Sequence, residues 1–191
     1  MSCTTTTHQN PPIVYAASLS DYNAGTLHGC WLDLSELTTE EEIQEAIAAM
    51  LAQSPEAAKY PDEEAEEWAF HDSQNCGNLS EFASLSTLAA IAADFETVAR
   101  EGLDWDLYLQ WLAHSGEDWG NVEQFRDCYH GAYDEPEDYA AELIEELYRL
   151  SDIPKLIRYH IDYAGIWRDL ELGGDCYAIR HGFQSHIFSN H

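Results

Sequence analysis

Two groups of side chains in this sequence have types and spacing that could support chemistry. Cys128 lies two residues before His130, an arrangement that could pair a thiol nucleophile with a general base. His181, His186 and His191 recur every five residues and could ligate a metal ion. Because a free cysteine most often packs as a small apolar residue, we interpret Cys128 as a buried structural thiol on a short helix. We interpret the three histidines as surface residues.

The sequence motifs of common catalytic sites are missing. There is no GxSxG, GxGxxG, Walker A or HExxH motif. Residues 169–180 begin like a calcium loop, but Arg180 stands where a bidentate glutamate is required. The sequence therefore predicts a protein that is not an enzyme, with no catalytic residue, no metal site and no cofactor. The enzymatic alternative is a small hydrolase that uses a carboxylate or a metal ion between Asp169 and His186.

Carboxylates are the dominant chemical groups of the chain. Its 36 Asp and Glu residues face eight Lys and Arg residues, which gives a formal net charge of −28. All of this net charge lies before residue 149, because Lys59, Arg100 and Arg126 are the only bases there, whereas acids and bases balance in residues 149–191. Halophilic adaptation would spread acids over the whole chain, so the asymmetry argues against it.

Several of these acids repeat at a spacing that disfavours an isolated helix. Glu41–Glu45, Asp138–Glu142 and Glu142–Glu146 are like-charge pairs four residues apart. Each such pair costs about 0.2–0.5 kcal/mol where a Lys or Arg would be stabilising. Solubility of a small domain needs a net charge of only about 2–8. We infer that the carboxylates are displayed to a partner.

The amount and spacing of the charge indicate what that partner binds. Duplex DNA carries one charge per about 1.7 Å of its axis, so the net charge matches the phosphates of about 14 base pairs. Acids at i, i+3 and i+4 on a helix stand about 4.5–6 Å apart, on the scale of a phosphate lattice. The array would fit the basic groove of a DNA-binding protein, while it would repel nucleic acid and anionic membranes. The alternative is an acidic chaperone or an inhibitor of another basic protein, such as a nucleoid protein.

Composition predicts a folded protein of the cytoplasm. Hydrophobic residues make up 45% of the chain, with six Trp and eleven Tyr, which is too many for a disordered acidic tail. No run of 18 apolar residues predicts a membrane span, and the first residues lack the features of a signal peptide. Five widely spaced cysteines without a CxxC motif are typical of reduced thiols.

The elements that would position the acids follow from hydrophobic periodicity. Strands are predicted at 13–18, 30–34 and 66–72. Thr39 and Glu42 predict a capping box at the start of a helix. The apolar stripe of this helix comprises Ile43, Ala46, Ile47, Met50 and Leu51.

Helices are predicted for most of the remaining chain. They cover 86–100, 104–115, Asn121 to Gly131 and a segment from Pro136, and Pro154 opens a further one. The helix 86–100 is predicted to bury Leu88, Ala92, Phe95 and Ala99, and that from Pro136 to bury Tyr139, Leu143, Leu147 and Leu150. Residues 176–180 and 183–188 predict a closing hairpin. The fold class is therefore α+β, with α+β ends and an all-helical middle. We place three small domains at 13–75, 76–118 and 119–191, after a disordered leader at 1–12.

Four segments resemble the ArdA antirestriction proteins of conjugative plasmids, transposons and phages. They are YAASLSDYNAGTLHGCWLDL at 15–34, AEEWAFHD at 65–72, FRDCYHGAYDEPEDYAAEL at 125–143 and IDYAGIWRDLEL at 161–172. The third segment resembles the family's antirestriction motif. The resemblance implies an elongated chain of three domains that forms a homodimer through its C-terminal part and mimics bent B-form DNA.

The resemblance also implies a partner and a place of action, while the charge pattern and the neutral aromatic tail supply the candidate binding residues. Family members bind the methyltransferase core of type I restriction-modification enzymes and block restriction, and often modification, in the cytoplasm of a bacterial host that receives new DNA by horizontal transfer. The phosphate-mimicking candidates are Glu40, Glu41, Glu42, Glu45, Asp62, Glu63, Glu64, Glu66, Glu67, Asp134, Glu135, Glu137, Asp138, Glu142, Glu145 and Glu146. The dimer-interface candidates are the aromatic residues Tyr159, Tyr163 and Trp167.

Overall fold

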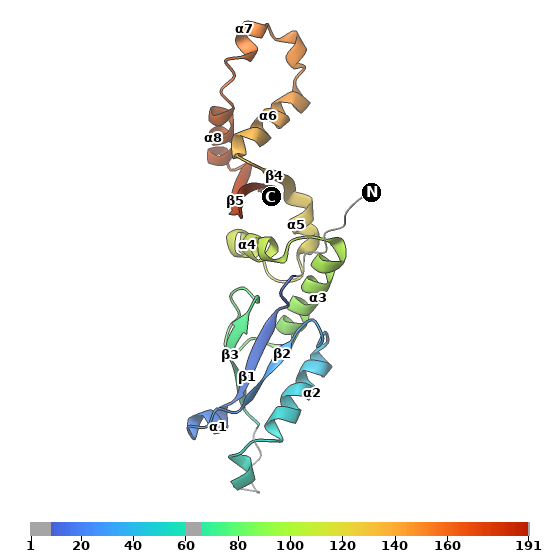
Figure 1. Cartoon of the computed structure of the whole chain (residues 1–191), viewed down its shortest axis with the longest axis vertical. Helices are drawn as coiled ribbons and strands as arrows, with labels where there is room; N and C mark the ends of the chain where they lie inside the picture. Colours follow the sequence, from blue (N-terminus) through green and yellow to red (C-terminus); the bar gives the residue numbers. More distant parts are fainter. Residues whose placement is uncertain (1–8, 60–65, 191) are drawn as a thin grey trace. The chain divides into compact units, whose positions relative to one another are not determined.

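The computed structural model describes residues 9–59 and 66–190, which form an α+β fold (Figure 1). The chain divides into two compact units, Met1–Val122 and Glu123–His191. Residues 1–8 of the predicted leader lie outside the described residues, while Pro11 and Pro12 accept hydrogen bonds from Asn75 and Leu34. The division into three domains remains a prediction.

The first unit begins with a three-stranded antiparallel sheet in the order β2-β1-β3. Its strands are β1 (Ile13–Ser18), β2 (Gly29–Asp33) and β3 (Trp68–Gln74), which confirms the three predicted strands to within a few residues. Helix α1 (Leu19–Asn23), which periodicity did not predict, follows β1 directly. Side chains alternate along β1, so that Val14 and Ala16 are buried while Tyr15 contacts Trp31 of β2 at 5.2 Å between ring centroids.

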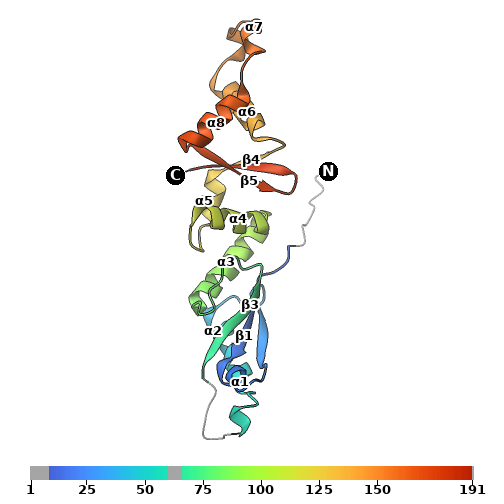
Figure 2. The same cartoon turned by 90° about the vertical axis from the view of Figure 1, so that its left-hand side faces the viewer.

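Helix α2 (Glu40–Leu51) packs across β1 and β2 (Figure 2). The predicted capping box is confirmed: the Thr39 hydroxyl accepts from the Glu42 amide at 3.2 Å, and the Glu42 carboxylate accepts from the Thr39 amide at 3.1 Å. Ile43, Ile47 and Met50 of the predicted stripe are buried. The helix therefore buries one side and presents the other to water.

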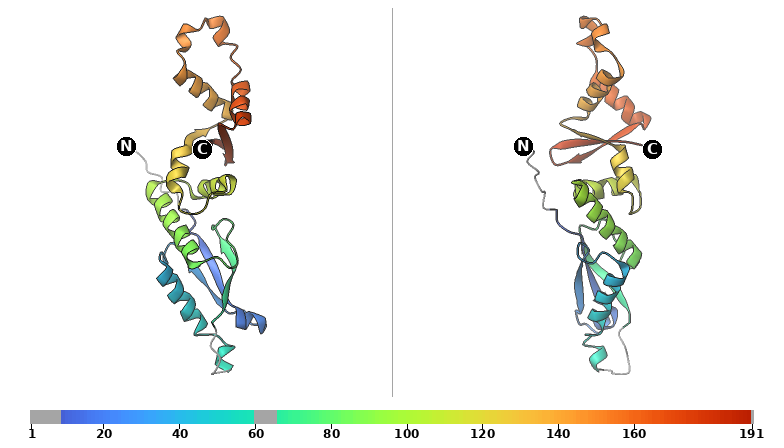
Figure 3. Two further views of the ribbon diagram at one scale, coloured as in Figure 1. Left: turned by 180° about the vertical axis from the view of Figure 1, so that it is seen from behind. Right: turned by 90° about the vertical axis from the view of Figure 1, so that its right-hand side faces the viewer.

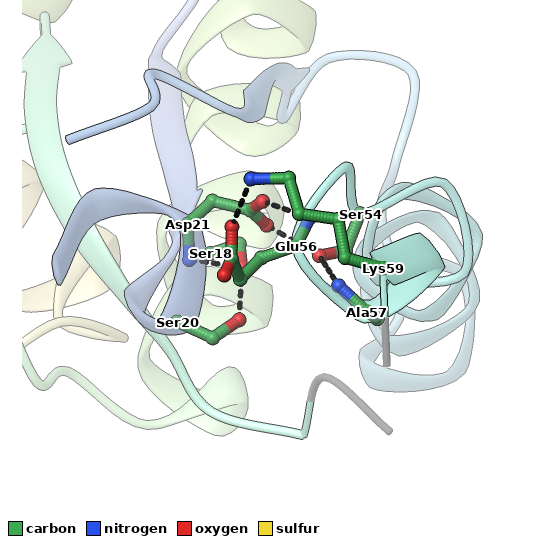
Figure 4. A network of polar contacts seen from close by, with 7 residues as sticks. All are labelled: Ser18, Ser20, Asp21, Ser54, Glu56, Ala57 and Lys59. Atoms are coloured by element: carbon green, nitrogen blue, oxygen red, sulfur yellow. Dashed lines mark hydrogen bonds and ion pairs between the residues drawn. The ribbon is translucent and has the colours of Figure 1, made fainter. Parts of the chain in front are cut away.

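A buried carboxylate holds α1 to the chain that follows α2 (Figure 4). Asp21 accepts a hydrogen bond from the Ser54 hydroxyl at 2.6 Å and one from the Glu56 amide at 2.8 Å. Burial alone would raise the pKa of Asp21, but the hydrogen bonds from Ser54, Ser18 and Glu56 together lower it. The short helix η1 (Ala57–Lys59) begins beside this network, where Lys59 pairs with Glu56 at 2.6 Å.

Replacing Asp21 by Asn is expected to lower the free energy of unfolding by about 2–3 kcal/mol at pH 7, because a charged acceptor of two hydrogen bonds is lost. Since the folded-state pKa lies below the unfolded one, the stabilisation is complete above about pH 5 and disappears as pH falls through the folded value. Urea unfolding at pH 7 and pH 2.5 measures this, with the exposed Asp72→Asn as control. An equal loss at both pH values would show that the carboxylate charge plays no part.

The rest of the first unit is helical. Helix α3 (Leu85–Glu101) begins at the Ser84 cap and ends at Gly102, and α4 (Trp105–Ser115) begins at the Asp104 cap and ends at Gly116. Both glycines have the positive φ expected of helix ends. Leu88 and Ala92 are buried as predicted, but Ala99 lies exposed in the last turn of α3.

The core between α3 and α4 is aromatic and contains one carboxylate. Trp105, Tyr108 and Trp111 are buried. Asp94 of α3 accepts from the Tyr108 hydroxyl and from the Gly120 amide, each at 2.7 Å. Burial raises the pKa of Asp94, although both hydrogen bonds act against the rise. This carboxylate therefore fixes the segment that follows α4.

The second unit contains a three-stranded antiparallel sheet in the order β4-β6-β5. Its elements are α5 (Val122–Cys128, which begins in the first unit), β4 (Tyr129–Tyr133), α6 (Pro136–Leu147), η2 (Leu150–Asp152), α7 (Lys155–Arg158), α8 (Tyr163–Gly173), β5 (Cys176–His181) and β6 (Gln184–Ser189). The predicted closing hairpin is confirmed as β5 and β6. Helices α6 and α8 lie side by side (Figure 3).

Two predictions about this unit are wrong. The helix predicted from Asn121 to Gly131 ends at Cys128, because Tyr129 to Tyr133 instead pair with β6 through a bulge before Gly131. Leu147 is exposed rather than buried, since it is the last residue of α6 and the chain leaves the core there. The core consists of Tyr139, Ala140, Trp167, Cys176 and Ile187.

Candidate functional site: carboxylates on two helices

Exposed carboxylates lie along one side of α2. The α2 cluster, Glu40, Glu41, Glu42 and Glu45, is fully exposed. Its first three members occupy the first helical turn, where the helix dipole favours negative charge. Hydrogen bonds from the Thr38 and Thr39 amides lower the pKa of Glu42, which favours its anionic form. The start of α2 therefore favours these carboxylates, and Glu42 most directly.

A second set of carboxylates surrounds α6. The α6 cluster comprises Asp134, Glu135, Glu137, Asp138, Glu142, Glu145 and Glu146. All are exposed except Glu137, which is half-buried. Asp138, Glu142 and Glu145 follow one another by four and three residues, so they form a row on the helix surface. Tyr139 and Ala140 occupy the opposite, buried side.

The end of α6 carries charge of the unfavourable sign. Glu145 and Glu146 lie in its last turn, where the dipole favours cations, and no basic residue occupies that turn. Glu146 also lies four residues after Glu142, another glutamate. These positions lower the stability of the helix, so their acidity requires a reason outside the fold.

The aromatic residues of the segment 125–143 hold the α6 cluster in place. Tyr133 contacts Tyr139 at 5.6 Å, and Tyr139 contacts Trp167 of α8 at 6.3 Å, between ring centroids. Burial raises the pKa of Tyr133 to about 12, with a further contribution from its hydrogen bond to the Glu142 carboxylate. Gly131 has a φ of +131°, which favours glycine, and the Tyr133 ring lies 3.4 Å from where a Cβ atom would be. The segment therefore places a buried aromatic core beneath exposed acids.

Arg180 contacts the α6 cluster, and sequence reasoning did not find this contact. Arg180 of β5 donates to the Asp134 carbonyl and to the Ser185 hydroxyl, each at 3.1 Å. It also lies 3.9 Å from the Glu135 carboxylate. Arg180 is far from Asp134 and Glu135 in the sequence, so the pairing of β4, β6 and β5 is what brings them together. The partial neutralisation leaves Glu142, Glu145 and Glu146 as the more strongly charged part of the cluster.

The remaining candidate acids are close to residues that the structure does not describe. Asp62, Glu63 and Glu64 lie outside the described residues. Glu66 and Glu67 are exposed just before β3, and the Glu67 carbonyl accepts from the Leu19 amide at 3.0 Å. This hydrogen bond ties the end of the acidic segment to α1.

The three dimer-interface candidates differ in exposure. Tyr159 is 79% exposed, whereas Trp167 is 8% exposed and belongs to the core of its own unit. Tyr163 is half-buried at the start of α8. Exposed apolar side chains accompany Tyr159 between the ends of α6 and α7, namely Leu147, Tyr148, Leu156 and Ile157.

Cys128 and His186, two of the residues first considered for chemistry, make hydrogen bonds within the fold. The Cys128 thiol is buried and donates to the Gln124 carbonyl at 3.0 Å, which confirms a structural thiol. His186 hydrogen-bonds the Tyr129 hydroxyl at 2.9 Å, while His191 lies outside the described residues. Within the described ranges, no group of three or more His, Cys, Asp or Glu side chains could hold a metal ion. Among those same residues, no helix has the length and apolarity needed to span a membrane.

Exposed carboxylates on helices that each bury their opposite side define an acidic α+β protein. The family model described as "Antirestriction protein (ArdA)" matches residues 14–185, so the chain belongs to the ArdA antirestriction family. This match confirms the resemblance of the four sequence segments. The family name implies a function against restriction, through interaction with restriction-modification enzymes. A search of the curated proteins found no match.

Proposed function

We propose that this protein is a non-enzymatic inhibitor of type I restriction-modification enzymes. In this proposal its carboxylates replace DNA phosphates in the DNA-binding groove of the methyltransferase core. Restriction of incoming DNA is then blocked in the cytoplasm of the bacterial host, and modification can be blocked with it.

The observation that carries this proposal is the pattern of exposed acids on α2 and α6. Acids at helical spacing stand at intervals close to those of phosphates, and each helix is held by buried side chains on its opposite side. Glu145 and Glu146 oppose the dipole of α6, as expected for charges selected for binding rather than for stability. A basic groove that tracks a phosphate backbone offers the complementary charge.

A competition experiment tests the proposal. A labelled DNA duplex containing the recognition site is bound to a purified type I methyltransferase core, and the protein is added at two salt concentrations. We expect the protein to displace the duplex, with weaker displacement at the higher salt concentration because the interaction is ionic. A basic nucleoid protein bound to the same duplex serves as the comparison. Displacement from the nucleoid protein without displacement from the methyltransferase core would refute the assignment.

We further propose that the protein forms a homodimer through the segment 147–159. The exposed apolar side chains of this segment adjoin a pocket of about 740 Å³ lined in part by Arg158, Tyr159 and Tyr163. The Nε atom of Arg158 is buried there and has no hydrogen-bond partner among the described residues. A second copy could cover the apolar surface and supply the missing acceptor. Most of the segment lies within residues 149–191, where acids and bases balance, so two copies meet with little repulsion.

Sedimentation equilibrium is expected to give twice the chain mass of 21.6 kDa for the wild-type protein. The double variant Leu156→Glu/Tyr159→Glu is expected to sediment as a monomer, because it buries two charges in the interface. Phe183→Glu serves as the matched control, since Phe183 is 93% exposed on the β5–β6 turn of the same unit. A wild-type monomer, or a double variant that still dimerises, would contradict the proposed interface.

A further inference from the structure

A small pocket in the first unit combines an apolar wall with a carboxylate rim. It has a volume of about 240 Å³ and lies between Gly77 and the C-terminal end of α4. Leu109, Leu112 and Trp119 contribute apolar surface, and Glu117 and Asp118 contribute carboxylates. None of these residues belongs to the α2 or α6 cluster. The pocket is smaller than the roughly 300–1,000 Å³ of sites for drug-sized ligands, so its size suits a single side chain.

The indole of Trp119 is held in a defined orientation. It stacks on Trp105 with 6.0 Å between ring centroids and an interplanar angle of 22°. Trp105 is itself buried and donates its indole N–H to the Asn75 carbonyl at 2.9 Å. On the other side in sequence, Asp94 holds the Gly120 amide at 2.7 Å. The ring is therefore fixed by its neighbours before any partner binds.

Gly77 forms the side of the pocket next to the Trp119 ring. Gly77 has a φ of +56°, and a Cβ atom there would lie 3.6 Å from Cζ2 of Trp119 and 3.8 Å from Cδ2 of Leu109. A side chain at position 77 would therefore contact both the ring and the leucine. Because glycine has no side chain, the space beside the ring stays available to a side chain of a partner.

The rim gives the pocket its charge. Glu117 and Asp118 are both exposed, and the Glu117 carboxylate accepts a hydrogen bond from the side-chain Nδ2 of Asn121 at 3.4 Å. A carboxylate has about four acceptor positions, so each can accept further hydrogen bonds. An aromatic face beside carboxylates favours a cation with an apolar stem. Arginine meets this description best, since its planar guanidinium stacks on indole and donates two hydrogen bonds to one carboxylate.

We propose that this pocket binds an arginine side chain of the partner enzyme. The inference rests on the proposed function, because a DNA-binding groove supplies arginines that normally contact phosphates. The α2 and α6 clusters replace phosphates by charge alone, whereas the pocket adds an aromatic contact and a defined position. Its contribution is therefore less sensitive to salt than that of the exposed clusters, because stacking on Trp119 does not depend on ionic strength.

The first test requires no enzyme. The indole N–H signal of Trp119, assigned by comparison with Trp119→Phe, is followed by NMR in the full chain while Nα-acetyl-arginine methylamide is added. We expect a saturable shift with millimolar affinity, a weaker one with the lysine analogue, and none with the norleucine analogue. In Glu117→Gln/Asp118→Asn the shift is expected to require at least fivefold more of the arginine probe. An equal response to norleucine, or no response to arginine, would overturn the proposal.

The second test uses competition with DNA for the methyltransferase core. Glu117→Gln/Asp118→Asn is expected to weaken competition at least fivefold more than the control Glu96→Gln/Asp106→Asn, which removes one Glu and one Asp exposed on α3 and α4. Equal losses in the two double variants would overturn the pocket's role in binding the enzyme. If the wild-type protein fails to compete at all, the proposed function fails, while the NMR titration still decides whether the pocket accepts arginine.

Discussion

Removing the three carboxylates in the C-terminal half of α6 is expected to weaken competition with DNA about 30-fold. Glu142, Glu145 and Glu146 are exposed, and a charge pair of each with a basic partner contributes about 0.7 kcal/mol, so three pairs amount to about 2 kcal/mol. Each single change to Gln is expected to cost only about threefold, since the contributions are similar and shared. The salt dependence of competition is expected to fall with each charge removed.

The matched control for Glu142→Gln/Glu145→Gln/Glu146→Gln is Asp152→Asn/Asp169→Asn/Glu171→Gln. It removes three exposed charges from the charge-balanced part of the same unit. The control is expected to lose less than threefold, and thermal unfolding should show that neither variant is destabilised. Equal losses in the two triple variants would refute the hypothesis that the acids of α6 share the binding to the enzyme. The same hypothesis would also be refuted if Asp138→Asn alone abolished competition while the fold stayed intact.

Replacing Gly29 by Ala is expected to destabilise the first unit by about 3 kcal/mol, or roughly 10 °C in Tm. Gly29 begins β2 and pairs with Ala17 of β1. A Cβ atom at Gly29 would lie 2.3 Å from the Ala16 carbonyl oxygen and 2.7 Å from Cζ of Tyr15. The first contact is with backbone, so the clash is relieved only by shifting β1 against β2. The second would displace Tyr15 from its contact with Trp31.

Urea unfolding followed by circular dichroism measures this change. Gly25→Ala is the control, because Gly25 has a φ of +80° but open space around it, so its loss is expected to be only about 1 kcal/mol. Similar losses in the two variants would contradict the predicted clash of a Cβ atom at position 29 with the Ala16 carbonyl and the Tyr15 ring.

Local sequence signals predicted much of this fold because their physical causes are local. The Thr39–Glu42 capping box lies within one helical turn, and the closing hairpin has two short strands joined by a turn with Gly182 at a φ of +60°. The carboxylates of α2 and α6 were likewise found from spacing alone. In each case the residues that decide the structure are neighbours in the chain.

The features that sequence reasoning missed depend on partners distant in the chain. Strand β4 forms because β6, more than fifty residues later, offers a free edge, and that pairing ends the helix at Cys128. Asp21 is buried because Ser54 supplies its hydroxyl, and Arg180 neutralises Glu135 through the sheet. The Trp119 pocket also needs Gly77 and α4 to come together. In a sequence with so many acids, nothing next to Asp21 in the chain distinguishes this buried aspartate from the exposed ones.

The hydrogen bonds at the start of α2 and α6 divide the acids into two kinds. Glu42 accepts from the amides of Thr38 and Thr39, and Asp138 accepts from the amide of Glu135 at 3.1 Å. These two carboxylates already accept hydrogen bonds from backbone amides, so fewer of their acceptor positions are left for a partner. Glu145 and Glu146 lie at the C-terminal end of α6, so they cannot cap the first turn of this helix. Under the proposed function, exchanging the outward-facing acids would change which enzymes are bound, whereas Glu42 and Asp138 are also held in place by their role in the fold.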